Sequence, residues 1–137
     1  MFFKKDKNIK IDKDLIKIGA LLIHAAKIDE NYSKKEETII KEALLEIGAN
    51  NKNLEGIIEN AIAMEKNANQ ILDFTREVKN MNHEDKIQII ETLWKIIYSN
   101  KEADIYETNL MRRLAGLLYI DNKIMGNIKD KIKKENS

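Results

Sequence analysis

Apolar residues recur along this chain at intervals of three and four positions, the spacing that places side chains on one face of an α-helix. The first such stripe lies between residues 13 and 28, at Leu15, Ile18, Leu22 and Ala25. No stretch alternates polar and apolar residues for long enough to indicate a half-buried strand, and the chain contains no proline. The pattern therefore predicts an all-α fold.

Seven amphipathic segments of this kind follow one another, separated by polar turns. The first two cover 13–28 and 34–47, the third ends at Met64, and the other four carry apolar stripes at 71–81, 87–97, 110–118 and 124–132. The fifth is the most apolar, so we predict that it is the central helix of a single-domain bundle. The predicted buried set includes Leu22, Ala26, Ile40, Leu44, Ile90, Trp94, Ile97 and Leu114.

Polar residues at the segment ends match known helix caps. Ser33 and Glu36 predict a capping box, in which the serine oxygen accepts the N3 amide and the glutamate binds the serine amide. Asp104 and Glu107 repeat this chemistry before the sixth segment. Gly48 lies where a helix often ends on a left-handed residue. Further predicted start signals are Asn50, Asn82 and Asp121.

Two stretches of the chain resemble each other. Aligning residues 16–47 with residues 87–118 matches four identical residues, and two of the aligned positions are polar pairs of matched chemistry, one of them among the four identities. These pairs are Ser33 with Asp104 and Glu36 with Glu107. Because the helical period imposes nothing on loop residues, the match favours duplication over coincidence. We therefore expect about seven helices arranged as two similar helix-loop-helix halves.

Length and composition suit one soluble domain. A chain of 137 residues can bury roughly two thirds of the surface that its unfolded form exposes. No apolar run reaches the ~18 to 20 residues of a membrane-spanning helix. The start lacks the pattern of a signal peptide and there is no cysteine, so we expect a cytoplasmic location. We divide the chain into a flexible lead at residues 1–12 and a helical domain at 13–134.

The charge of the chain excludes one class of partner. Its 24 basic and 23 acidic residues give a net charge of +1, so no overall field attracts it to nucleic acid. Phe2 and Phe3, which stand beside lysines, could touch a membrane surface, but the segment is short and a disordered start is the favoured interpretation. We expect a protein partner that the sequence does not identify.

Several motifs together resemble the TerB-like family, which is named after a bacterial tellurite-resistance determinant. They extend through roughly residues 14 to 130 and are Ala25-Ala26-Lys27-Ile28-Asp29-Glu30-Asn31-Tyr32-Ser33-Lys34-Lys35-Glu36, Phe74-Thr75-Arg76-Glu77, Leu93-Trp94-Lys95-Ile96-Ile97-Tyr98-Ser99-Asn100, Ile105-Tyr106-Glu107 and Leu110-Met111-Arg112-Arg113-Leu114-Ala115. The resemblance implies an all-helical bundle with two similar halves, a stress-related role and no established enzymatic reaction. It also implies a divalent-metal role for two acidic loops. Those loops usually carry Asp-Gly in the family, whereas this chain has Asp29-Glu30 and Asn100-Lys101.

Four carboxylates are the candidate metal ligands, because hard cations such as Ca²⁺ and Mg²⁺ prefer oxygen. They are Asp29, Glu36, Asp104 and Glu107. The competing interpretation is structural: the two glutamates cap their helices, and Asp29 is a solvated turn residue. An EF-hand is excluded, since Lys34 and Ile40 occupy the positions where that loop needs glycine and a bidentate glutamate.

Catalytic residues are scarce in the sequence. There is no cysteine, and neither His24 nor His83 has a serine or acidic partner at a recognisable spacing. His24 lies beside the apolar stripe and is expected to be exposed. The three arginines, Arg76, Arg112 and Arg113, are expected to pack their stems and to pair with acids, or to form a basic patch for an acidic partner.

These features favour a non-enzymatic interaction or adaptor module, with weak binding of a divalent cation. No catalytic residue and no cofactor other than Ca²⁺ or Mg²⁺ is assigned. The alternative is a metal-dependent hydrolase that uses the two acidic loops. Convergent carboxylates in a pocket would favour the enzyme, whereas solvent-open loops would favour the adaptor.

Overall fold

Seven α-helices make up the described part of the chain, which a computed structural model covers at residues 2–27, 33–67, 72–99 and 105–135. No strand occurs in these ranges, so the predicted all-α class is confirmed. The helices are α1 (Phe2–Ala26), α2 (Lys34–Ile47), α3 (Leu54–Asn67), α4 (Leu72–Lys79), α5 (His83–Tyr98), α6 (Ile105–Leu117) and α7 (Asn122–Glu135).

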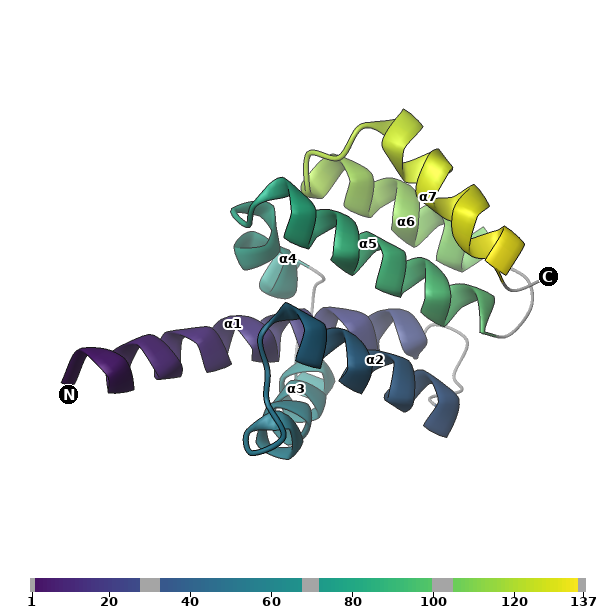
Figure 1. The fold of residues 1–137 in the computed structure, drawn as a ribbon. Coiled ribbons are helices and arrows are strands. Elements are labelled where there is room, and N and C mark those ends of the chain that lie inside the picture. Colours follow the sequence, from purple (N-terminus) through teal and green to yellow (C-terminus); the bar gives the residue numbers. More distant parts are fainter. Residues whose placement is uncertain (1, 28–32, 68–71, 100–104, 136–137) are drawn as a thin grey trace.

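The first helix begins at Phe2, well before the start that the apolar stripe predicts near residue 13. Residues 2–12 contain neither glycine nor proline, so nothing in them interrupts a helix that is anchored further along the chain. This early part of α1 extends away from the other helices (Figure 1). The stripe therefore marked the part of α1 that lies among the other helices and not where α1 begins.

Two helices share the centre of the bundle. The helix α1 packs against α2, α3, α4 and α5, and α5 packs against α1, α2 and α7 (Figure 1). The prediction of α5 alone as the central helix is therefore incomplete. Apolar periodicity ranks helices by their own hydrophobicity and does not count the neighbours that surround each one.

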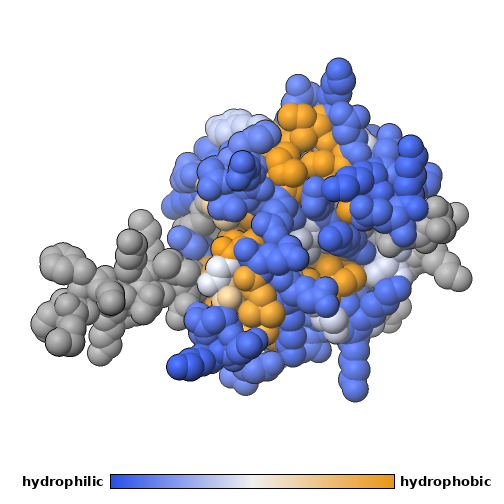
Figure 2. Space-filling view, in the orientation of Figure 1, coloured by the Kyte–Doolittle hydropathy of each residue, from blue (hydrophilic) through white to orange (hydrophobic). Residues whose placement is uncertain are grey.

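The core contains every residue that the sequence predicts to be buried. All eight residues of that set are buried, and Trp94 on α5 is 2% exposed. Polar residues cover most of the face drawn in Figure 2, and apolar side chains show between them. No helix in the described ranges has the length and apolar character needed to cross a membrane.

Gly19 lies where α1 crosses α3. A Cβ atom built at this glycine would lie 3.0 Å from the Cβ of Ala61 on α3, closer than side-chain carbons normally pack. Leu44 on α2 lies 3.7 Å from the same point. The two helices therefore approach each other closely at Gly19, and a side chain at this position would separate them.

The predicted caps are present at several helix ends. The side chain of Asn82 accepts the amide of Asp85 at 2.8 Å, and Asp121 accepts that of Lys123 at 2.8 Å. Gly48 ends α2 with a φ of 153°, in the range that favours glycine. Short-range polar patterns therefore located these ends correctly.

The C-terminal ends of α1 and α5 and the N-terminal ends of α2 and α6 lie at one end of the bundle (Figure 1). We call this the loop end. The helix α4 and the connection from α6 to α7 lie at the other end (Figure 1). Both predicted helix-loop-helix halves thus direct their turns the same way, while their similarity in detail stays a prediction.

Candidate functional site

Glu36 is the candidate ligand whose contacts are best defined. It lies in the first turn of α2 and is 1% exposed. One of its carboxylate oxygens accepts hydrogen bonds from the amide and the hydroxyl of Ser33, both at 3.0 Å. The Ser33 hydroxyl oxygen accepts the Glu36 amide at 3.2 Å. The predicted capping box is therefore confirmed, and its glutamate is buried.

Glu107 occupies the corresponding position in the first turn of α6 and is 4% exposed. Burial, together with the negative charges of Asp130 and Glu107, raises the pKa of the Tyr98 phenol above its usual value of 10.0. Tyr98 is therefore neutral at pH 7. The Glu107 carboxylate thus lies in a polar region to which α5, α6 and α7 contribute and in which Glu107 and Tyr98 are buried.

Aromatic and basic side chains extend this buried region along α5. The rings of Trp94 and Tyr98 stack with centroids 5.9 Å apart, and the Lys129 ammonium lies 5.6 Å from the centre of the Trp94 ring. The buried indole nitrogen of Trp94 has no hydrogen-bond acceptor among the described residues. The sequence analysis did not assign Tyr98, although its four-residue spacing from Trp94 predicts that the two rings meet.

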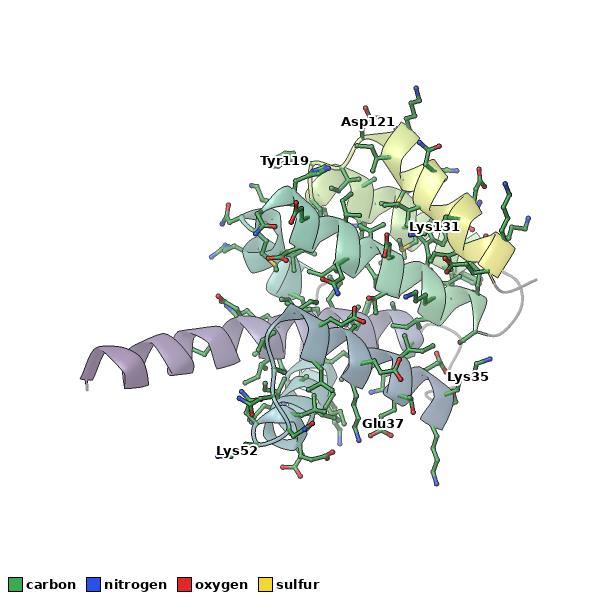
Figure 3. The ribbon with its side chains drawn as sticks, in the orientation of Figure 1. Lys35, Glu37, Lys52, Tyr119, Asp121 and Lys131 are labelled. Carbon is green, nitrogen blue, oxygen red and sulfur yellow. The ribbon has the colours of Figure 1, made fainter. Side chains whose placement is uncertain are left out.

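One hydrogen bond joins the two predicted halves at the loop end. Lys35 lies at the start of α2 (Figure 3). Its ammonium donates to the carbonyl of Ser99, which follows the last turn of α5, at 3.3 Å. The helices α2 and α5 also pack against each other. The first turn of α2 therefore lies beside the last turn of α5, which leads into the second acidic loop.

The structure places two of the four predicted metal ligands. Glu36 and Glu107 both lie at the loop end, in the first turns of α2 and α6. Asp29 and Asp104 lie outside the described residues. Among those that are described, no three acidic or histidine side chains gather in a way that could hold one ion. The four-carboxylate site therefore stays a prediction.

The histidines have the environments of structural side chains. His83 is exposed at the start of α5. His24 was expected to be exposed but is only partly so. Its Nδ1 lies 3.3 Å from one carboxylate oxygen of Glu65, and the other oxygen of the same carboxylate accepts a hydrogen bond from Lys27. The expectation failed because helical periodicity placed His24 beside the buried stripe of α1 without showing that α3 covers that flank.

The arginines are more exposed than the stem-packing prediction implies. Arg76, Arg112 and Arg113 are all exposed. Within the described ranges, none of them forms an ion pair with a carboxylate. The predicted pairing with acids is thus not found there, and Arg76 remains available to another anion.

Comparison with known proteins gives one match. A family model described as tellurite resistance protein TerB matches residues 15–130, most of the chain. No curated protein and no solved structure matches the chain significantly.

Proposed function

The chain belongs to the tellurite resistance protein TerB family, and we propose that it is a non-enzymatic helical module that binds a protein partner through the loop end. We place its action in the cytoplasm, in a stress-related process. We also propose that the loop end binds Ca²⁺ or Mg²⁺ weakly, through Asp29, Glu36, Asp104 and Glu107.

The observation that carries the partner proposal is the exposure of Tyr106. This tyrosine lies in the first turn of α6 and is 71% exposed, although its neighbour Glu107 is buried. Tyrosine is enriched among the residues that dominate protein interfaces, because its large rigid ring loses little entropy on binding. An aromatic side chain held on a helix terminus is therefore suited to insert into a partner.

The surroundings of Tyr106 supply the other features of an interface. Lys34 and Lys35 are exposed at the start of α2, at the same end of the bundle. The capping box of Ser33 and Glu36 fixes the first turn of α2. A partner would thus meet a basic and aromatic surface on preformed helix ends, which favours an acidic segment and lowers the entropic cost of binding.

The test is affinity capture from the native host with the full chain immobilised, compared among three proteins. These are the wild type, Tyr106→Ser and Tyr119→Ser. Tyr119 is a matched control because it is 70% exposed, close to the exposure of Tyr106, and lies beyond the opposite end of α6. We expect one captured protein to be retained in equal amount by the wild type and by Tyr119→Ser. The amount retained by Tyr106→Ser should be about tenfold lower.

Two results would contradict the proposal. One is a partner that is lost with Tyr119→Ser but kept with Tyr106→Ser, since this would place the interface at the other end. The other is equal retention by all three proteins. No contact among the described residues favours a metal-dependent hydrolase, so the interaction module is proposed alone.

A further inference from the structure

A pocket of about 280 Å³ lies between the end of α4 and the end of α6, away from the loop end. Its lining residues are Thr75, Arg76, Lys79, Gly116, Leu117 and Tyr119. Figure 3 shows Tyr119 at the opposite end of the molecule from Lys35. Neither Glu36 nor Glu107 lines this pocket.

Tyr119 has a backbone conformation that tyrosine seldom adopts. Its φ of 57° lies in the left-handed region, where a Cβ atom is strained. The Ile120 amide donates to the Ala115 carbonyl at 2.9 Å, and the Tyr119 amide donates to the Gly116 carbonyl at 3.4 Å. This is a Schellman motif, and Tyr119 occupies the position that glycine usually fills.

Burial of the Tyr119 side chain does not compensate for this strain, since 70% of the residue is exposed. A left-handed non-glycine residue points to a role for its side chain. The ring does form one wall of the pocket, and the Lys79 ammonium lies 4.9 Å from its centre. The tyrosine is therefore placed to contact whatever enters the pocket.

The described side chains that line the pocket include two cations and no carboxylate. Arg76 and Lys79 are both exposed on the last turn of α4, and neither pairs with a carboxylate within the described part of the chain. The dipole of α4 explains a cation in its last turn. The dipole does not explain why two cations line a pocket together with the strained Tyr119.

We propose that this pocket binds a small organic anion that carries a flat apolar body. The Arg76 guanidinium binds the anionic group through two parallel hydrogen bonds, and Lys79 adds a second positive charge. The Tyr119 ring and Leu117 pack against the body of the ligand. The volume lies near the lower limit for ligand pockets, which suits a single ring with one charged substituent.

The test is titration of the full ¹⁵N-labelled chain, followed by amide chemical shifts. The probes are phenyl phosphate and benzoate, with phenol as the uncharged control and inorganic phosphate as the control without a ring. We expect saturable shifts at the amides of 75–79 and 116–119 with at least one of the two aryl anions. The tighter of the two identifies the anionic group as phosphate or carboxylate.

Substitutions then connect binding to the side chains. Arg76→Gln should raise the Kd of the aryl anion about tenfold or more, because it removes the charged, bidentate contact. Tyr119→Gly should also raise this Kd, severalfold. Because the glycine relieves the backbone strain, a loss of binding in this variant cannot be ascribed to unfolding. Arg112→Gln, at an exposed arginine of α6 that does not line the pocket, should leave binding unchanged.

The proposal is overturned if neither aryl anion gives saturable shifts at these amides. It is equally overturned if phenol binds as tightly as the anions, or if Arg76→Gln binds like the wild type. Inorganic phosphate that binds as tightly as phenyl phosphate would remove the role of Tyr119 and Leu117. Because Tyr106 lies at the loop end, none of these results depends on the partner proposal.

Discussion

The two ends of α6 differ in how their charged side chains are placed. At its start, a carboxylate is buried: Glu107 is 4% exposed, and the charge that it contributes helps to raise the pKa of Tyr98. Beyond its last turn, Arg76 and Lys79 are exposed around a pocket, and Tyr119 holds a left-handed conformation. The start of α6 therefore buries a carboxylate, and the region beyond its last turn exposes two cations.

This difference separates structural from functional polar residues. The buried Glu36 is hydrogen-bonded to Ser33, so its position is explained by the start of α2. Tyr119 is strained and exposed, so the fold gains little from it. Removing a polar group that stabilises the fold should therefore lower the free energy of unfolding. Removing a residue that serves binding should not.

The largest expected effect is at the loop end. Glu36→Ala leaves the Ser33 amide and hydroxyl without their acceptor, and we expect the free energy of unfolding to fall by about 1 to 2 kcal/mol. Glu36→Gln keeps an acceptor oxygen and should retain most of that stability. Urea unfolding followed by circular dichroism measures both. Equal losses for Ala and Gln would show that the charge matters more than the cap.

A cation should act on the same end. If the four predicted ligands hold Ca²⁺ or Mg²⁺, a tenfold excess over Kd raises the unfolding free energy by about 1.4 kcal/mol. The Glu36→Gln, Glu107→Gln double variant keeps the capping oxygens but lacks the anionic ones, so this increase should disappear. Melting curves with and without each cation test it. A wild-type melting point that ignores millimolar cation would leave the two glutamates as caps alone.

The smallest expected effect is at the pocket end and has the opposite sign. Tyr119→Gly removes the left-handed strain at some cost in unfolded-state entropy, so we expect a gain of about 0.5 to 1 kcal/mol. The matched control is Gly48→Ala at the end of α2, where φ is 153° and a loss is expected. Urea unfolding compares the two. A loss of stability with Tyr119→Gly would mean that the ring serves the fold.

The sequence was most informative wherever structure depends on near neighbours. Ser33 and Glu36 are three positions apart, and their capping box formed as predicted. The close approach at Gly19 has a sequence signal as well, because a glycine inside a buried helix is typical of a helix crossing. His24 shows the limit of this reasoning, since the cover that α3 provides comes from residues about forty positions away.

The candidate sites divide in the same way. Glu36 and Glu107 were assigned from their place in the loops, and their burial was not foreseen, because burial depends on which helices pack over the first turns. Asp29 and Asp104 lie outside the described residues, so their convergence with the glutamates stays a prediction. Arg76 was noted in the sequence only as one of three arginines, with no signal that distinguished it.

By itself, the sequence determined the all-α class, the helices and most of their ends, because periodicity and caps are set by contacts within a few residues. Only the tertiary structure brought the end of α4 against the end of α6 and so created the pocket of Arg76, Lys79 and Tyr119. Residues 75–79 and 116–119 share no local pattern. They meet because α4 packs against α1, while α6 packs against α7, which in turn packs against α5. That arrangement depends on side-chain packing between distant segments.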